Sequence, residues 1–517
     1  MTTLFIIAAL AIPFTAELLA TPMAIKDERR AAFYWLTPIM GLLVYTGFLI
    51  ITAHPYLALA GSTLYYFGLT AISNKKYEIL GDPFNAHDFD NARNLYIYPE
   101  FYISHVGWPI LGLISLMLAA IIGSSLYFED PITLYEFGPW YLVWPITVLG
   151  WFAMLRLLAW AITQFFTEAS ASQAGLSLSL QTDIARFGLF PTILLYRLLL
   201  KHKTDKKSLR QRPIKAQITT AKPADIIAVQ GESYFDLERF FSKVEHGAKW
   251  SLLDTLRKQG VTTGQIGVPA WGAYTMQTEF SFLSGLRNDV LGIDSINPYM
   301  RLAQKPVSTF VEALREAGYH TICIHPAKKE FFRRAHVMPN LGFDDFIGIE
   351  AFDKPHLFGK YISDDTLADK IDEITKAHHS ISKQPLFIFA ITIESHGPWA
   401  KDRLTPHLPA NTSEADLLAA NITDDHEFTL YQAHMENLIS FYRRLTVERP
   451  PNTPDRVVAM YGDHMPALGR LFGHHGFTDK PVDYLLWSSR NTAREYGKQK
   501  IETFSKTMLA EADIKLD

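Results

Sequence analysis

The sequence predicts two structural parts: an N-terminal multi-span α-helical membrane domain and a C-terminal α/β domain with a mostly parallel central sheet. Two observations carry this prediction. Residues 1 to about 200 are mostly apolar, in runs that each approach the roughly 20 residues a helix needs to cross a bilayer. From about residue 222 onward, β-rich runs alternate with helical ones, which is typical of an α/β domain.

The composition of the 517-residue chain excludes several classes of protein. Its formal net charge of −4 gives no support for a nucleic-acid binder, so we expect no nucleic-acid partner. Cys323 is the only cysteine, so neither an intramolecular disulfide nor a cysteine-based zinc cluster can form. A disulfide-stapled secreted fold is therefore excluded, whereas the cellular compartment is left open.

The membrane domain is expected over residues 1–167 with about five helices. The apolar runs lie at about 3–25, 31–53, 56–73, 105–127 and 141–166. The first run is not a cleavable signal peptide, because no basic segment precedes it and further spans follow at once. Glu17 lies within this run, where a charge is costly and usually faces a helix bundle or a cavity.

Residues 168–221 are expected to form an interfacial segment and a linker. The apolar stretch 187–200 is short and contains Pro191, so an amphipathic segment along the membrane surface suits it better than another crossing. The stretch 201–215 carries seven Lys or Arg residues and one acid, Asp205, which favours contact with anionic lipid.

The α/β domain is expected over residues 222–517. Its strand candidates are 225–230, 319–324, 385–393, 456–461 and 483–488, and its helix candidates are 248–259, 307–317, 364–377 and 427–446. Ligands of such sheets bind at the carboxyl ends of the strands. The residues that directly follow the predicted strands are therefore the first candidates for an active site.

Several residues with metal-binding or proton-transferring side chains stand at these positions: Glu232, His325, His396, Asp463 and His464. Glu232, Asp463 and His464 supply two carboxylates and one imidazole, a ligand set suited to Mn²⁺, Zn²⁺ or Mg²⁺. Taken singly, such residues commonly cap a helix or make hydrogen bonds within a turn. Their shared placement at strand ends favours a metal site.

The stretch 269–285 presents the hydroxyl of Thr275 at the start of an apolar run predicted to be helical, with Phe280, Leu283 and Leu286 on one face. A helix N-terminus suits a nucleophile, because its backbone N–H groups stabilise an attacked anion. Most threonines at such positions are only helix caps. A divalent ion beside Thr275 would lower the pKa of its hydroxyl and offset the charge that develops on a phosphoryl group.

Four residues are candidates for binding an anionic substrate: His325 and His396, already named, and Phe332 and Arg334. Arginine binds phosphate oxygens bidentately, and histidine can hydrogen-bond a phosphate or protonate a leaving alkoxide. The alternative interpretation is that the basic residues between 328 and 334 form a solvated surface.

These motifs resemble those of the lipoteichoic acid synthase and membrane phosphoglycerol transferase group of the alkaline phosphatase/sulfatase superfamily. The resemblance covers about residues 222–490 and is carried by the ordered stretches 231–233, 275–280, 332–346 and 461–464. It implies a sulfatase-like fold for the domain 222–517. It also implies that Glu232, Thr275, Asp463 and His464 surround a catalytic metal, that Thr275 forms a covalent phospho-intermediate, and that Arg334 and His396 bind substrate.

The chain departs from this group at two positions. Phe332 stands where lipoteichoic acid synthases carry Trp, and Thr275 is followed by Met-Gln-Thr-Glu instead of Ser-Asp-Ser-Glu. These departures weaken the case for a polyglycerolphosphate synthase in particular. The nucleophile signature of sulfatases, a Cys or Ser followed by Pro and Arg, is absent, and Cys323 lies within a predicted strand.

The resemblance implies metal-dependent transfer of glycerophosphate from phosphatidylglycerol to an envelope glycan or polymer. We expect one divalent ion, with Mn²⁺ as first choice and Zn²⁺ or Mg²⁺ as alternatives. The nearest rival is a phosphoethanolamine transferase of the same superfamily, followed by a phosphodiesterase or phosphatase in which water resolves the intermediate. A non-catalytic envelope scaffold is the remaining alternative.

The orientation in the membrane rests on two indications that disagree. The basic stretch 26–30 favours a cytoplasmic first loop, which with five spans leaves the C-terminal domain in the cytoplasm. The group that the motifs resemble acts outside the cytoplasm. We therefore expect a multi-pass protein of the bacterial cytoplasmic (inner) membrane with residues 202–517 on the extracytoplasmic side; an even number of crossings with an outside N-terminus also fits.

Overall fold

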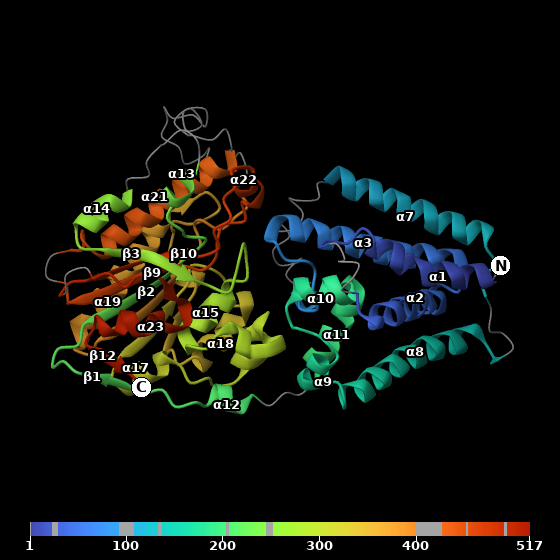
Figure 1. The fold of residues 1–517 in the computed structure, drawn as a ribbon, viewed down its shortest axis with the longest axis horizontal. Helices are drawn as coiled ribbons and strands as arrows, with labels where there is room; N and C mark the ends of the chain where they lie inside the picture. The colour runs from blue at the N-terminus through green and yellow to red at the C-terminus, as the bar shows by residue number, and fades with distance from the viewer. Residues whose placement is uncertain are drawn as a thin grey trace. The chain divides into compact units, whose positions relative to one another are not determined.

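The computed structural model divides the chain into two compact units, Met1–Thr204 and Asp205–Asp517. The structure describes residues 2–22, 29–91, 108–132, 137–202, 206–243, 252–399, 426–450, 453–490 and 494–517. Figure 1 shows an all-helical N-terminal unit and a C-terminal unit in which helices cover a sheet.

The first unit contains a long helix in each of the five expected apolar runs: α1 Thr2–Glu17, α2 Ala31–Thr52, α3 Pro55–Leu80, α7 Trp108–Phe128 and α8 Trp140–Thr163. Among the described residues, α2 and α8 are long and apolar enough to cross a membrane, by length and composition alone. Helix α3 continues through the polar residues after 73, beyond the apolar run expected at 56–73. The number of spans stays a prediction.

Three shorter helices follow, α9 Glu168–Gln173, α10 Leu180–Phe187 and α11 Leu189–Lys201. Glu17, at the end of α1, accepts hydrogen bonds from the backbone N–H groups of Leu189 and Phe190, both at 2.9 Å. A carboxylate at a helix N-terminus satisfies donors that have no partner within the helix. Glu17 thus caps α11. The expected position of α11 at a membrane surface stays a prediction.

The second unit is built on an eight-stranded sheet with the order β11-β3-β10-β9-β2-β8-β4-β5. Its strands are β2 Asp225–Gly231, β3 Thr262–Gly267, β4 His320–Ile324, β5 Asp345–Ile347, β8 Leu386–Ile391, β9 Arg456–Gly462, β10 Val482–Ser488 and β11 Gln499–Lys500. Only β10 runs against its neighbours in this sheet. The predicted mostly parallel sheet is confirmed.

Helices cover both faces of this sheet (Figure 1). On one face lie α15 Thr275–Ser284, α17 Phe310–Glu316 and α23 Ile501–Ala510, and on the other lie α14 Leu252–Lys258, α19 Asp364–Ile381 and α21 His426–Leu445. The rings of Phe282 on α15 and Phe389 on β8 stack with their centroids 5.9 Å apart. The core of the unit therefore has two apolar layers, one on each side of the sheet.

The remaining elements are short. They include α12 Lys207–Arg210, α13 Glu238–Phe241, α16 Pro298–Arg301, α18 Arg334–Asn340, α22 Gly469–His474, the β1–β12 pair Ala216–Ile218 with Ile514–Leu516, and the β6–β7 pair Leu357–Phe358 with Tyr361–Ile362.

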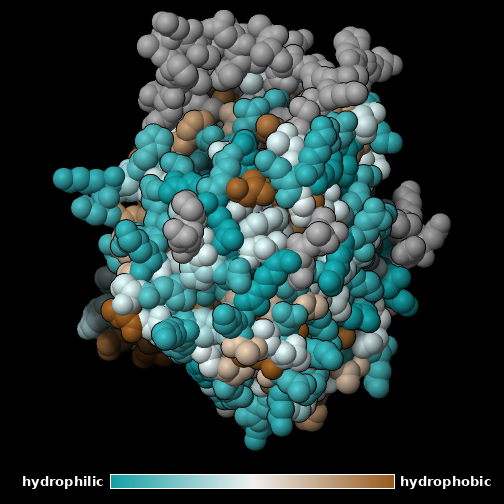
Figure 2. Space-filling model, turned by 90° about the vertical axis from the view of Figure 1, so that its left-hand side faces the viewer, coloured by the Kyte–Doolittle hydropathy of each residue, from teal (hydrophilic) through white to brown (hydrophobic). Residues whose placement is uncertain are grey.

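Figure 2 shows a face of the molecule on which hydrophilic residues predominate and hydrophobic areas are small. This surface is typical of a domain in water.

All five expected strands are present, whereas β3, β5 and β11 were not predicted. Strand β3 reads Thr-Thr-Gly-Gln-Ile-Gly and lacks an apolar pattern. Its Gly264 is required, because a Cβ at that position would lie 2.7 Å from the Tyr484 ring on β10. Helix α15 ends at Ser284, with Gly285 in the left-handed conformation, so Leu286 lies outside the helix in which it was predicted.

Candidate active site

The candidate site begins at the ends of two neighbouring parallel strands. Gly231 of β2 pairs with Gly462 of β9, so the residues that follow, Glu232 and Asp463, emerge side by side. A Cβ on Gly462 would lie 1.9 Å from the Tyr234 carbonyl oxygen, so only glycine allows this approach of the two chains. The strand register thus brings together acids that are 231 positions apart in the sequence.

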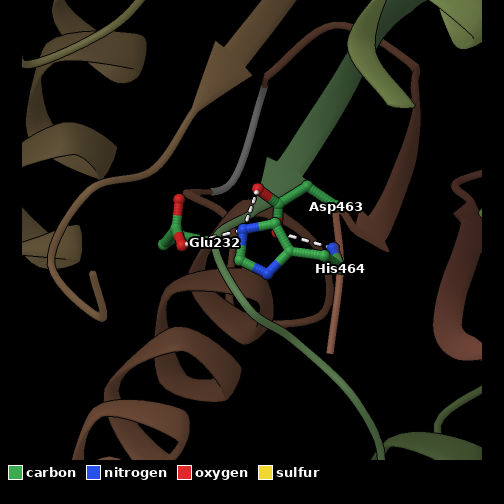
Figure 3. A group of neighbouring side chains, drawn as sticks. All are labelled: Glu232, Asp463 and His464. Carbon is green, nitrogen blue, oxygen red and sulfur yellow. Dashed lines mark hydrogen bonds and ion pairs between the residues drawn. The ribbon is translucent and has the colours of Figure 1, made fainter. Parts of the chain in front are cut away.

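Glu232, Asp463 and His464 point toward one another (Figure 3). One ligand atom of each lies within 4.8 Å of the others, and all three residues are buried. The Nε2 atom of His464 lies 3.3 Å from Asp463 Oδ2 and 3.6 Å from Glu232 Oε1. These three side chains are the candidate metal ligands that were predicted from the sequence, and the fold assembles them in one place.

Hydrogen bonds orient each of these side chains. The Nδ1 atom of His464 donates to the Met465 carbonyl oxygen at 2.9 Å, which leaves the Nε2 lone pair facing the two carboxylates. Asp463 Oδ1 accepts from the N–H groups of Ser233 and His464 at 2.8 and 2.9 Å. Within the described part of the chain, the buried Asp463 Oδ2 has no hydrogen-bond partner. An imidazole lone pair and an unsatisfied carboxylate oxygen that converge fit a divalent cation.

The charges of the site lead to the same conclusion. Burial and the neighbouring Glu232 carboxylate raise the pKa of Asp463 to about 7. Burial lowers the pKa of His464, but the Asp463 and Glu232 carboxylates outweigh it and raise that pKa above its ordinary value. Two buried carboxylates repel each other unless a proton or a cation lies between them. The residues present therefore fit a metal ion.

Thr275 is the first residue of α15 and lies beside this cluster. Its hydroxyl lies near the Asp463 carboxylate and lowers the pKa of that acid, a smaller influence than burial. One turn later, the Thr278 hydroxyl donates to the Asp463 carbonyl oxygen at 2.6 Å. Tyr274 precedes the helix in the left-handed conformation, with φ of 68°, an uncommon geometry for a bulky residue. This turn sets the hydroxyl of Thr275 at the helix N-terminus.

Arg334, at the start of α18, is almost completely buried and pairs with Glu279 of α15. The two residues before it, Phe332 and Arg333, both adopt positive φ angles, 52° and 59°. The guanidinium carbon of Arg334 lies 5.2 Å from the centre of the Phe332 ring. Within the described residues, Arg334 Nη1 is buried without a hydrogen-bond partner, so this nitrogen has a donor to offer to an anion.

His325 and His396 follow β4 and β8 at the same edge of the sheet. His325 Nδ1 donates to the Ile391 carbonyl oxygen at 3.0 Å. Burial, and next the charges of Arg334 and His396, hold the pKa of His325 well below its ordinary value. His325 is therefore neutral and offers Nε2 as an acceptor. His396 packs against Tyr361 with ring centres 5.8 Å apart.

The sequence motifs included Glu279 but gave it no role. In the structure it accepts hydrogen bonds from Gln230, Tyr299 and Arg334, and it is fully buried. The available signal was its spacing of four residues from Thr275, one helical turn, which places both on one side of α15. Its function is to hold Arg334 against the helix that carries the hydroxyl.

The sulfatase family profile matches residues 225–511 of the chain. A capsular polysaccharide biosynthesis protein, RkpI of Rhizobium meliloti, is 28% identical over 455 residues, 86% of this chain and 79% of that protein. A putative cyclic β-1,2-glucan modification protein of the same organism is 27% identical over 271 residues, 52% of this chain. The match spans 39% of the length of that second relative.

The fold is also found in solved structures. The integral membrane protein lipooligosaccharide phosphoethanolamine transferase A from Neisseria meningitidis superimposes with a TM-score of 0.52, at 12% identity, over 97% of this chain and 95% of its own. The phosphoglycerol transferase GacH from Streptococcus pyogenes, solved with sn-glycerol-1-phosphate, has a TM-score of 0.45 at 22% identity, over 59% of this chain and 77% of its own.

The resemblance drawn from the motifs is confirmed by the profile, because the matched residues include every candidate site residue from Glu232 to His464. The α/β unit with its mostly parallel sheet, preceded by apolar helices, agrees with the fold of the full-length transferase. The chain belongs to the sulfatase family.

Proposed function

We propose that this protein transfers glycerophosphate from phosphatidylglycerol to an envelope glycan or polymer, through a covalent intermediate on Thr275. One observation carries the proposal: the Thr275 hydroxyl lies at a helix N-terminus beside the Asp463 carboxylate, which converges with Glu232 and His464. A nucleophile beside a divalent-ion ligand set is suited to phosphoryl transfer.

Glu232, Asp463 and His464, together with the Thr275 hydroxyl, are the proposed ligands of one divalent ion, with Mn²⁺ preferred over Zn²⁺ and Mg²⁺. When bound, the ion would lower the pKa of the Thr275 hydroxyl and offset charge on the phosphoryl oxygens. Hard carboxylate oxygens together with a single imidazole accommodate all three ions, so the preference is for experiment to test.

In the first half-reaction, Thr275 Oγ attacks the phosphorus of the lipid. The new Oγ–P bond forms as the P–O bond to diacylglycerol breaks, and the hydroxyl proton ends on the departing diacylglycerol oxygen. In the second half-reaction, an acceptor hydroxyl attacks the same phosphorus, the Oγ–P bond breaks, and Thr275 recovers a proton. The proposed contacts for the phosphate oxygens and the leaving group are Arg334 Nη1, His396 and His325, of which His325 is neutral. Phe332 lies beside Arg334.

A sulfatase-type nucleophile is not available at this site. Cys323 lies in the middle of β4, is fully buried, and has its pKa raised well above the ordinary value by burial and then by the Glu279 carboxylate. A thiol of this kind is a structural residue and does not react. The hydroxyl of Thr275 is thus the proposed nucleophile.

The names of two relatives support the proposed acceptor, and the location is part of the same proposal. The relatives are named for capsular polysaccharide biosynthesis and for modification of a cyclic glucan, which favours a glycan acceptor for this chain. The membrane domain, residues 1–167, is the proposed multi-pass anchor in the bacterial inner membrane, with the interfacial segment and linker at 168–221. The catalytic domain, 222–517, would lie on the extracytoplasmic side, near the lipid headgroups that it consumes.

The second candidate is a phosphoethanolamine transferase. It is favoured by the similarity in fold to such an enzyme over nearly the whole chain. The two candidates differ in the headgroup that remains on Thr275. A phosphodiesterase or phosphatase differs in the second half-reaction, where water replaces the acceptor, and a scaffold would carry out neither step.

The deciding experiment is intact-mass analysis of the full-length protein in lipid vesicles with Mn²⁺. Vesicles contain either phosphatidylglycerol or phosphatidylethanolamine, and Thr275→Ala is run in parallel. We expect a glycerophosphoryl adduct on the wild type with phosphatidylglycerol only. An ethanolamine phosphate adduct would replace the proposal with the second candidate. Free glycerol phosphate formed without any glycan would indicate hydrolysis, and neither adduct nor product would indicate a scaffold.

A further inference from the structure

A polar cavity lies at the same edge of the sheet as the candidate active site, on the face covered by α14. Its volume is about 220 Å³. Among the residues that line it are Tyr234, Asp236, Arg239, Arg257 of α14, Gln265 of β3 and Asp483 of β10. None of these six residues belongs to the metal cluster or to the substrate contacts described above.

The charged groups in this cavity neutralise each other. Asp483 accepts a hydrogen bond from Arg239 and another, at 2.9 Å, from the backbone N–H of Asp236. Asp236 in turn accepts from Arg257 Nη2 at 3.0 Å. Two carboxylates and two guanidinium groups are thereby paired. An ionic ligand would find no unpaired counter-charge in the cavity, so its chemistry favours a neutral, polar ligand.

Hydrogen-bonding capacity is nevertheless left over. The Tyr234 hydroxyl is buried and, within the described part of the chain, has no hydrogen-bond partner; its residue is 1% exposed. Arg239 Nε is also buried without a partner there. A buried hydroxyl without a partner costs about 1–3 kcal/mol, so such groups normally face water or a ligand. Tyr234 is one of the residues that line the cavity.

The cavity shares its inner wall with the active site. Tyr234 comes two residues after Glu232, and its carbonyl oxygen is the atom that a Cβ on Gly462 would meet. Asp483 is the second residue of β10 and lies beside the end of β9, where Tyr484 pairs with Tyr461. A ligand held here is therefore close in structure to the segments that carry Glu232 and Asp463.

We propose that this cavity binds a neutral polyhydroxylated ligand, one sugar ring of a glycan. Sugar hydroxyls both donate and accept hydrogen bonds, which matches the Tyr234 hydroxyl, the Gln265 amide and the Arg239–Asp483 pair. The role of this ring as part of the acceptor rests on the proposed function. Binding of the sugar itself does not, because it requires neither the lipid nor Thr275.

The test measures sugar binding to the full-length protein in detergent, without lipid donor. The probe is the β-1,2-linked glucose disaccharide sophorose, followed by saturation-transfer NMR and titration. Tyr234→Phe removes only the unpartnered hydroxyl, so its folding should be unimpaired, and we expect binding to weaken by about two- to tenfold. Gln265→Leu, at another residue that lines the cavity, should weaken it similarly.

The matched control is Tyr319→Phe, which removes a buried hydroxyl that donates to the Ala224 carbonyl oxygen, away from the cavity. Its affinity for sophorose should equal that of the wild type. Equal affinity in Tyr234→Phe and Gln265→Leu, or no binding of sophorose by the wild type, would overturn the proposal. Thr275→Ala should bind sophorose with wild-type affinity. The sugar-binding proposal and the proposed transfer reaction can therefore fail independently of each other.

Discussion

Arg334 clamps the helix that carries the nucleophile: its Nε and Nη2 atoms donate to the two carboxylate oxygens of Glu279 at 3.2 and 2.8 Å. Glu279 lies one turn after Thr275 on α15, and both partners are at most 1% exposed. This bidentate pair fixes α18 against α15 and leaves Nη1 of Arg334 for an anion. The position of the hydroxyl and that of the phosphate-binding group are thus set by one buried contact.

Removal of one partner of this pair should destabilise the catalytic unit strongly. Glu279→Gln leaves the Arg334 charge buried and unpaired, so we expect a loss of about 3–5 kcal/mol in the free energy of unfolding, measured by denaturant titration. The double variant Glu279→Gln/Arg334→Met should recover part of this loss. The control is Asp369→Asn, which breaks an exposed pair with Arg444 and should change the same quantity by at most about 1 kcal/mol. Equal effects of the two single variants would contradict the clamp.

Replacement of the nucleophile should separate chemistry from folding. Thr275→Ala removes the attacking oxygen, and we expect the transfer rate to fall by roughly 10⁶-fold, as in other enzymes that lose a nucleophile. The variant should nearly keep the wild-type Tm and metal affinity, because the three charged or imidazole ligands, Glu232, Asp463 and His464, are unchanged. The matched control Thr255→Ala, at an exposed position of α14, should transfer at the wild-type rate. Substantial transfer by Thr275→Ala would rule out the covalent mechanism.

Metal dependence should be visible in stability as well as in activity. Mn²⁺ at about 100 times its Kd should stabilise the folded wild type by about 2.7 kcal/mol, read as a rise in Tm. In Asp463→Asn this rise should disappear, whereas the metal-free variant should be at least as stable as the metal-free wild type, since repulsion from Glu232 is relieved. Asp345→Asn, at an exposed acid that pairs with His320, serves as the control and should keep the full rise. A full rise in Asp463→Asn would place the ion elsewhere.

The buried acid Asp364 should make stability depend on pH. Burial, and then the Glu394 carboxylate, raise its pKa in the folded protein well above the ordinary value. The folded state therefore retains a proton that the unfolded state releases above about pH 4, so stability falls as pH rises through the window between these pKa values, by about 1.4 kcal/mol per pH unit. Denaturant titrations at pH 5 and pH 7 should show this fall in the wild type.

Asp364→Asn should abolish that part of the pH dependence, because it removes the titrating group. Its free energy of unfolding at pH 7 should exceed that of the wild type. In the folded wild type, the Asp364 carboxyl must either hold a proton that the unfolded chain would release or be buried as an anion, and both cost stability. Asp364 is the first residue of α19, and Asp365 beside it is exposed, so Asp365→Asn provides a control at the same helix end. An unchanged pH profile in Asp364→Asn would assign the dependence to another group.

Local sequence patterns account for much of the fold. The five predicted strands were visible because their cores are apolar and β-rich, as in Ile226 to Val229. Strand β3, Thr262–Gly267, could not be predicted from the sequence, because it is a strand only through its pairing with β10 and β11. Its hydrogen bonds are made with residues more than 200 positions away, and no local pattern encodes them.

The candidate ligands could be named from the sequence because Glu232, Asp463 and His464 directly follow apolar strands, and a parallel sheet gathers such positions at one edge. The sequence by itself therefore determined the residue types of the site and the edge of the sheet at which they lie. Only the tertiary structure decided which side chains make contact. The Gly231–Gly462 register and the Glu279–Arg334 clamp both depend on atoms brought together from distant segments, where distance and burial, not sequence spacing, set the energy.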